Sequence, residues 1–352
     1  MLNKIETSKK IPEIFSFETL LCIFVIFIHT SSEAIDNFDS VPTLATVLFV
    51  LWKLVSFVVP AFIFLSGLKL SKKYAEEKVS YFRFLSRRIT KIYFPYLLWV
   101  VIYYCYFCFF TSIAEFSSFS YTDLLWHAIN PDFVAHFYFI SVIMQFYLLF
   151  PALLFVIKRS TPWIVILISL IITIVFKANI NPMVRSLSYG YIDRAFTTYF
   201  VFFICGCYAG IYYKNFTFWL KIFRSLLSKL YFVIAAAHVV LSTLEYLGKY
   251  KYVYSDGVYI VFCVISTVVF YNFCMKLNLY SIKINESFKG LASLAFYVYL
   301  SHILVIFITE NLLNINNITD IGQRFALVTV AACLISPVGA FLYVKLKNSI
   351  RR

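Results

Sequence analysis

The sequence predicts an all-α membrane protein, a polytopic helix bundle of about ten transmembrane helices with both termini in the cytoplasm. Three observations lead to this prediction. Hydrophobic residues make up 62% of the 352 residues and charged residues only 14%, whereas soluble domains carry about 25% charged residues. The hydrophobic residues form blocks long enough to cross a bilayer, which takes about 17–25 residues. Loops that contain many Lys and Arg residues alternate along the chain with loops that contain few.

Continuous apolar runs favour helices over a closed barrel, which is the other structure that can satisfy all of its backbone hydrogen bonds in lipid. We expect the first span to be a retained helix rather than a signal peptide, because its apolar run is long and no small-x-small cleavage site follows it. The fifth span is the shortest. We expect one transmembrane domain over 1–352. The expected spans are 14–32, 45–68, 92–112, 136–157, 163–178, 195–213, 231–248, 257–276, 290–309 and 325–344.

The distribution of basic residues predicts the orientation of these spans. Of the 31 Lys and Arg, 24 fall on one side, six fall on the other, and Lys53 falls inside the second span. The crowded side holds both termini and segment 69–91, and cytoplasmic loops carry the excess of Lys and Arg in membrane proteins. The net charge of +14 therefore indicates plasma-membrane topology and contact with anionic lipid headgroups, and not nucleic-acid binding.

The eight cysteines predict neither a disulfide framework nor a metal site. All of them lie within apolar stretches or at their edges. Cys105 and Cys108 form a C-x-x-C pair, a spacing that elsewhere marks redox or metal chemistry. Because no second pair and no carboxylate lie nearby in the sequence, we interpret the two as small apolar residues of a helix.

Ionisable residues inside the expected spans are the first candidates for a site, since each costs about 2.5–3.5 kcal/mol at mid-membrane on insertion scales. Glu18 and His29 lie eleven residues apart in the first span, on one helical face and about 16 Å apart along the axis. The predicted orientation puts Glu18 near the cytoplasm and His29 near the outer side. His302 in the ninth span and His136 at the start of the fourth fall at a similar depth to His29.

These three histidines are candidate catalytic groups, because a neutral imidazole is a common general base near neutral pH. The alternative is that they only join helices by hydrogen bonds. We favour a functional role for His29, whose surroundings are otherwise apolar, and we interpret His127 and His238 as structural. Asp193 and Arg194, at the expected outer start of the sixth span, are candidates for the acceptor side.

A basic cluster at the start of the third span is the candidate donor site. Arg87, Arg88 and Lys91 directly precede Pro95. Cations of this kind bind the phosphates of an anionic donor, such as a phosphate-bearing carrier. The alternative is that they only set the orientation of the chain and contact lipid headgroups. The sequence leaves both interpretations open.

Several of these segments resemble the acyltransferase 3 family of integral-membrane proteins. FSFETLLCIFVIFIHT is similar to the family's first helix, which ends in a His, here His29. VPAFIFLSGLKL is similar to its second helix, with Ser66-Gly67. FLSRRITKIYFPYLLW is similar to its R-x-x-R-x-x-x-P segment, with Lys91 in the second basic place. HFYFISVIMQFYLLFP and LAFYVYLSH are similar to its later aromatic helices.

The resemblance implies a membrane O-acyltransferase. Such an enzyme moves an acyl group, acetyl or succinyl, from a cytoplasmic donor, acyl-CoA, to a hydroxyl of a cell-surface or exopolysaccharide sugar. It holds no tightly bound cofactor and no metal. The implied partners are a glycan or lipid-linked sugar acceptor, membrane lipids and a polysaccharide synthase complex. The chain length and Gln145-Phe146-Tyr147 are most similar to the branch that includes the intercellular adhesin biofilm protein IcaC.

The chain departs from the family pattern at one position. The family has an Arg eleven residues before the first-helix His, where it helps hold acyl-CoA, and this chain has Glu18. Because a carboxylate repels CoA phosphates, either Arg87, Arg88 and Lys91 hold the donor beside Glu18, or the donor differs, or activity is lost. Two other functions also stay open: an exporter of a polysaccharide such as poly-N-acetylglucosamine, and a non-catalytic partner of a polysaccharide synthase.

Overall fold

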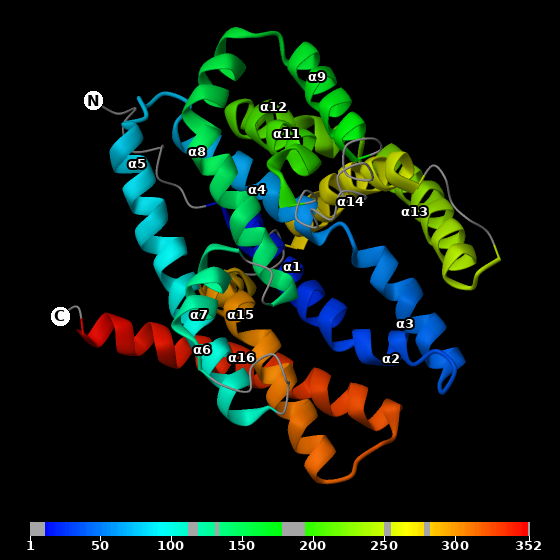
Figure 1. The fold of residues 1–352 in the computed structure, drawn as a ribbon. Coiled ribbons are helices and arrows are strands. Elements are labelled where there is room, and N and C mark those ends of the chain that lie inside the picture. The colour runs from blue at the N-terminus through cyan, green and yellow to red at the C-terminus, as the bar shows by residue number, and fades with distance from the viewer. Residues whose placement is uncertain are drawn as a thin grey trace. The chain divides into compact units, whose positions relative to one another are not determined.

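A computed structural model describes residues 11–111, 119–130, 134–177, 194–249, 255–277 and 282–350 (Figure 1). Throughout these ranges the regular structure is helical, without strands. Eight of the helices are long and apolar enough to cross a membrane. The predicted all-α membrane bundle is therefore confirmed, whereas the cytoplasmic location of the termini stays a prediction.

The eight candidate spans correspond to the first four and the last four expected ones, and the fifth and sixth differ. Helix α9 (Pro162–Val175) has 14 residues, about 21 Å, which is shorter than a hydrocarbon core of about 30 Å. The sixth expected span, 195–213, falls on Phe196–Ile211, whose helix α11 (Phe200–Ile211) meets α12 (Tyr213–Ile222) at a bend of 102°. The bend arises at Tyr212, whose backbone leaves the helical region (φ −100°, ψ 40°).

The chain divides into two compact units, and each is described by itself. Unit 1 comprises Met1–Val58 and Thr217–Arg352, and unit 2 comprises Val59–Phe216. The single domain expected over 1–352 stays a prediction.

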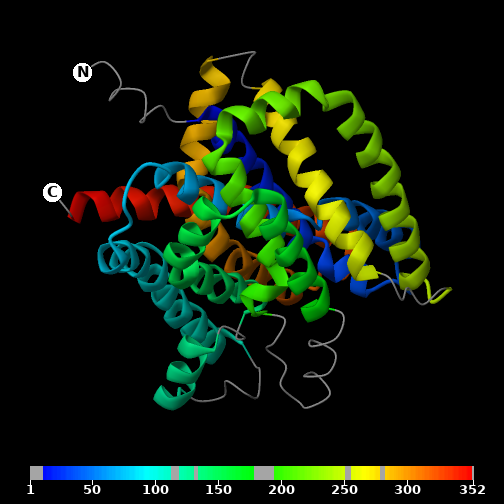
Figure 2. The ribbon, with the colours of Figure 1, turned by 90° about the horizontal axis from the view of Figure 1, so that it is seen from above.

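Unit 1 is built around its first helix, which packs against the last three helices of the chain. This central helix has buried Phe17, Leu21 and Val25, and Pro12 at its start fixes the backbone for helix entry. The two C-terminal helices form a hairpin, and α13 and α14 lie side by side (Figure 2). The helices of unit 1 are α1 (Pro12–Thr30), α2 (Ser32–Asp36), α3 (Pro42–Val55), α13 (Arg224–Tyr246), α14 (Ser255–Leu277), α15 (Ile282–Ile315) and α16 (Ile321–Ile350).

The turn between α15 and α16 follows from two residues. Asn317 has a positive φ of 55°, a conformation that Asn tolerates better than most residues. Asp320 then caps α16, because its Oδ1 accepts a hydrogen bond of 2.7 Å from the Gln323 backbone N–H. The turn places Arg324, in the first turn of α16, beside the end of α15.

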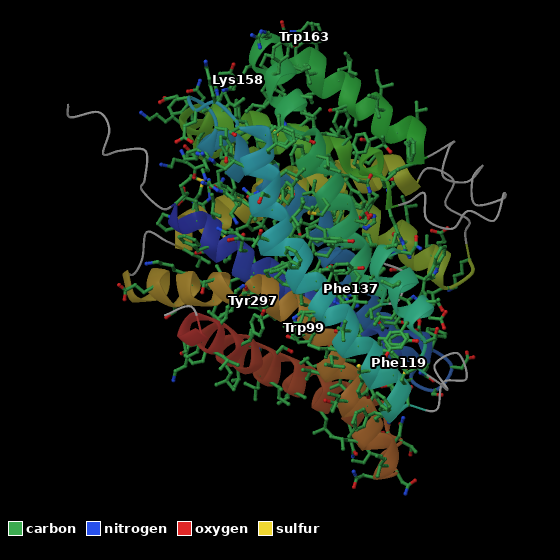
Figure 3. The ribbon with its side chains drawn as sticks, turned by 60° about the vertical axis from the view of Figure 1, so that its left-hand side comes forward. Trp99, Phe119, Phe137, Lys158, Trp163 and Tyr297 are labelled. Atoms are coloured by element: carbon green, nitrogen blue, oxygen red, sulfur yellow. The ribbon has the colours of Figure 1, made fainter. Side chains whose placement is uncertain are left out.

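Unit 2 is centred on α8 (Tyr138–Arg159), whose ends are marked by the labels of Phe137 and Lys158 in Figure 3. Phe146 and Phe150 are fully buried, and the Phe146 ring stacks on Phe203 of α11 at 4.3 Å between centroids. The other described helices of unit 2 are α4 (Val58–Lys73), α5 (Tyr81–Arg88), η3 (Ile89–Tyr93), α6 (Phe94–Phe110), α7 (Tyr121–Ile129), η5 (Ala135–Phe137), α9 and η8 (Phe196–Tyr199).

Three glycines let α4 and α11 pack so closely that their backbones are in contact. A Cβ atom at Gly206 of α11 would overlap the carbonyl of Phe64 in α4, and one at Gly210 would overlap the carbonyl of Leu68. On α4, a Cβ at Gly67 would meet the carbonyl of Phe203. Small residues at four-residue spacing serve the same purpose in other membrane helix pairs. The glycine of the Ser66-Gly67 motif is thus a packing residue.

We expect Gly206→Ala to destabilise the protein by about 1–3 kcal/mol, because the overlapping atoms belong to backbone that cannot rotate away. Fluorescence-detected size-exclusion chromatography after heating measures the shift in melting temperature. Gly339→Ala in α16 is the matched control, since a Cβ there has open space around it. A Gly206→Ala protein as stable as the Gly339→Ala protein would contradict the close approach.

Candidate functional site

The structure brings His29 of α1 and His302 of α15 together in unit 1. Their ring centroids lie 5.2 Å apart, with the ring planes tilted by 51°. This separation puts the two imidazoles in direct contact. This contact agrees with the similar depth expected for them on two outward-running spans, while their catalytic roles stay a prediction.

His302 is fully buried and its tautomer follows from its surroundings. Its Nδ1 lies 2.8 Å from the carbonyl oxygen of Tyr299 and 3.2 Å from that of Val298. A carbonyl oxygen can only accept a hydrogen bond, so Nδ1 carries the hydrogen. In the neutral ring the lone pair is then on Nε2, which makes Nε2 the basic atom of His302.

His29, by contrast, is only partly buried. The helix continues past it, because the Ser31 N–H donates to the carbonyl of Phe27 at 3.0 Å and the Ile35 N–H donates to the carbonyl of Ser31 at 3.1 Å. His29 is thus held on a rigid element with part of its surface open, whereas His302 has 0% exposure. Of the two, His29 is the side chain with part of its surface exposed, and the roles of both stay a prediction.

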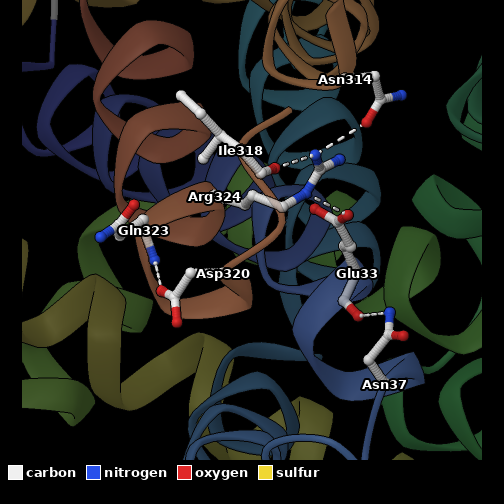
Figure 4. A network of polar contacts seen from close by, with 7 residues as sticks. All are labelled: Glu33, Asn37, Asn314, Ile318, Asp320, Gln323 and Arg324. Carbon is white, nitrogen blue, oxygen red and sulfur yellow. Dashed lines mark hydrogen bonds and ion pairs between the residues drawn. The ribbon is translucent and has the colours of Figure 1, made fainter. Parts of the chain in front are cut away.

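An ion pair lies beyond the histidine pair, toward the predicted outer end of unit 1 (Figure 4). The Arg324 Nε donates to Glu33 Oε1 at 2.7 Å, and Glu33 comes four residues after His29. The Arg324 Nη1 also donates to Asn314 Oδ1 at 2.9 Å and to the carbonyl of Ile318 at 3.0 Å. Sequence reasoning missed this cluster, although an Arg among only six basic residues on the predicted outer side was a signal.

In unit 2, Arg88 at the end of α5 differs from its basic neighbours. Its guanidinium lies over two aromatic rings, 5.2 Å from the centroid of Phe84 and 5.1 Å from that of Tyr147. Its Nε is buried and has no hydrogen-bond partner within the part of the chain that the structure describes. Arg87 and Lys91 are exposed. Of the three predicted donor-binding cations, Arg88 is the one whose guanidinium is held between neighbouring side chains, with its Nε buried.

The backbone next to Arg88 is irregular for a reason that the sequence contains. Pro95 has no N–H, so it cannot donate to the carbonyl of Lys91 one turn earlier. The segment Ile89–Tyr93 forms a π-helical turn, η3, between α5 and α6, and such turns are frequent at functional sites. Tyr147, under Arg88, is fixed by a 3.0 Å hydrogen bond between its hydroxyl and that of Ser66.

The remaining predicted site residues lie elsewhere or are not described. His136 is buried in unit 2 beside Phe137, with 4.4 Å between ring centroids, so its support of His29 stays a prediction. The carbonyl of Arg194 accepts a 3.0 Å hydrogen bond from Gln145 Nε2. Asp193 lies outside the described residues. Glu18 is a partly exposed residue of α1, and its place on the donor side stays a prediction.

The two histidines interpreted as structural lie among aromatic side chains. The His238 ring stacks on Phe262 at 4.5 Å between centroids. His127 lies on α7 in unit 2, where the carbonyl of its own backbone accepts a 3.3 Å hydrogen bond from the Tyr96 hydroxyl.

Comparison with known proteins gives one match. The sequence profile of the Acyl_transf_3 family, described as an acyltransferase domain, matches residues 17–345. This range contains His29, the Arg88 segment and His302, together with nearly all of the eight candidate membrane spans. No curated protein and no solved structure matches the chain. Because the match covers almost the whole sequence, the chain belongs to the Acyl_transf_3 family of membrane acyltransferases.

Proposed function

We propose that this acyltransferase moves an acetyl-type or succinyl-type group from cytoplasmic acyl-CoA to a hydroxyl of a cell-surface or exopolysaccharide sugar. Family membership gives the acyltransferase activity. The observation that carries the proposal is the pair of imidazoles in contact within an apolar bundle, one partly exposed and one with a defined tautomer. O-acyl transfer needs such a base, because a sugar hydroxyl is a weak nucleophile near neutral pH.

The reaction passes one proton from the sugar hydroxyl through His29 to the CoA sulfur and exchanges one acyl bond for another. A ring nitrogen of His29 takes the proton from the sugar hydroxyl while the hydroxyl oxygen bonds to the thioester carbonyl carbon. The carbon–sulfur bond breaks, and the CoA sulfur takes the proton back from His29 and leaves as a thiol. The buried ring of His302 helps to stabilise the imidazolium that exists between these two steps, through its basic Nε2.

The donor side of the proposal depends on Arg88. A guanidinium that lies over two aromatic rings and has an unused buried Nε is suited to bind a phosphate of CoA. Arg87 and Lys91 add exposed positive charge on the neighbouring turns. Arg88 in this way replaces the phosphate-binding cation that Glu18 cannot provide.

We place the protein in the plasma membrane with both termini in the cytoplasm, as its basic residues predict. Its partners are then the glycan or lipid-linked sugar on the outer side, membrane lipids, and a polysaccharide synthase complex that supplies the acceptor polymer. The similarity of Gln145-Phe146-Tyr147 to the IcaC branch supports an exopolysaccharide of the biofilm type as the acceptor.

Reconstitution in right-side-out liposomes tests function and orientation together. Radiolabelled acetyl-CoA or succinyl-CoA is enclosed, and neutral amino-sugar oligosaccharides are added outside. We expect label to appear in the outer saccharide, and no label when the acyl-CoA is added only outside. Movement of unlabelled saccharide across the bilayer would instead indicate an exporter. A protein that gives neither result, but co-purifies with a polysaccharide synthase, would be a non-catalytic partner.

A further inference from the structure

The ion pair beyond His29 leaves hydrogen-bonding groups unused. Arg324 is 7% exposed, and its three hydrogen bonds come from Nε and Nη1. Its Nη2 group, with two N–H donors, has no hydrogen bond within the described ranges of the chain. These three hydrogen bonds hold the buried guanidinium in one orientation and leave Nη2 as its unused donor group (Figure 4).

Two neighbours of Arg324 also have unused capacity. Glu33 uses Oε1 for the ion pair, and its side chain is 27% exposed. Asn314 accepts with Oδ1, which directs its two Nδ2–H donors elsewhere, and its side chain is exposed. The cluster therefore presents donors from Arg324 and Asn314 beside an acceptor from Glu33. This mixture suits neighbouring hydroxyl groups, each of which both donates and accepts.

The charge of the cluster indicates a neutral ligand. Glu310 of α15 interacts electrostatically with both Glu33 and Arg324. The Glu33 carboxylate compensates the charge of the guanidinium in the ion pair, so the cluster offers a bound anion no unpaired cation. Sugar hydroxyls need no such cation, and they gain hydrogen bonds to charged groups, which are stronger than neutral ones.

The cluster is also next to the proposed base. Glu33 follows His29 by four residues in a nearly continuous helix, which is one turn, or about 6 Å along the axis. The two side chains lie on the same face of that helix. A sugar ring held at Glu33 would therefore be adjacent to His29, and a hydroxyl of the same saccharide could reach the imidazole.

We infer that Arg324, Glu33 and Asn314 form a sugar-binding subsite that holds a neutral saccharide ring of the acceptor next to His29. The role of this subsite in catalysis rests on the proposed function, but the binding of a saccharide can be measured without any acyl transfer. It assigns the acceptor side to residues of unit 1.

Kinetics with the purified protein provide the first test. We expect Glu33→Gln and Asn314→Ala to raise the KM for a neutral saccharide acceptor by about 10–100-fold and about 3–10-fold, respectively, with kcat and the KM for acyl-CoA nearly unchanged. Asn314 is exposed, so its variant keeps the test valid if Glu33→Gln folds poorly. The matched control is Asp36→Asn, the same change at an exposed carboxylate of α2. An acceptor KM that is the same in all three variants would overturn the subsite.

Binding in the absence of donor provides the second test and separates the two proposals. Isothermal titration of N,N′,N″-triacetylchitotriose should show a dissociation constant that Glu33→Gln and Asn314→Ala raise and Asp36→Asn does not. If the trisaccharide binds in this way but no acyl group is ever transferred, the subsite stands and the proposed function fails. If transfer occurs but binding is the same in all variants, the function stands and the subsite fails. Stronger binding of trigalacturonate, an anion of equal length, would also overturn the subsite.

Discussion

His29→Ala should lower acylation of the surface polysaccharide by about 10²–10⁴-fold, the usual cost of removing a general base. The protein should still reach the membrane at its normal level. His29 is partly exposed, and a shorter apolar side chain at this position is tolerated in a membrane helix. Mass spectrometry of the polysaccharide measures the acyl content, and an immunoblot of the membrane fraction measures the protein.

The control for this prediction is His127→Ala. His127 lies on α7, contributes its backbone carbonyl to the Tyr96 hydroxyl, and has no place in the proposed chemistry. Its variant should retain acylation within about twofold, as is usual for a substitution that spares the catalytic groups. Normal acylation by a His29→Ala protein present at its normal level would remove the catalytic role and favour polysaccharide export.

The similar depth of the two histidines was predictable, whereas their contact also depends on the packing of α1 against α15. His29 and His302 lie on two spans that the basic-residue count orients in the same direction, and residues at equal depth on packed helices can meet. The fold class and eight of the spans were predictable for a similar reason, since a bilayer imposes the same length and polarity on every crossing. These features follow from properties that a single helix carries in its own sequence.

Other features depend on which helices pack together, and the sequence does not contain that information locally. Arg87 and Arg88 are adjacent residues of the same type, so the sequence does not distinguish them. Only the fold places aromatic rings from α5 and α8 under Arg88. The Arg324 cluster joins α2, α15 and α16. The expected sixth span ends at the bend at Tyr212, but the 102° change of direction was not predicted, because it depends on how α12 packs. Long-range pairing of this kind needs the structure.

Arg88→Ala should raise the KM for acyl-CoA by about 10–100-fold, the value of one or two charge-assisted hydrogen bonds to a phosphate. The KM for the saccharide acceptor should stay the same. Arg88→Lys should restore only part of the affinity, because an ammonium lacks the planar, parallel N–H pair that matches a phosphate and has no flat face to stack on Phe84 and Tyr147. Steady-state transfer of radiolabelled acyl groups, with each substrate varied in turn, measures both constants. Arg83→Ala, at an exposed residue of α5, is the control.

A donor lacking its 3′-phosphate identifies the atoms that Arg88 binds. If the guanidinium binds this phosphate, removing the phosphate and removing the side chain delete the same interaction, so their effects on KM should not multiply. The wild-type protein should then have a much lower KM for acyl-CoA than for 3′-dephospho-acyl-CoA, whereas the Arg88→Ala protein should have the same KM for both donors. Equal discrimination by both proteins would assign Arg88 to the pyrophosphate or to a lipid headgroup. Replacing anionic lipids with neutral ones in the liposomes separates these two, because only a headgroup contact disappears with them.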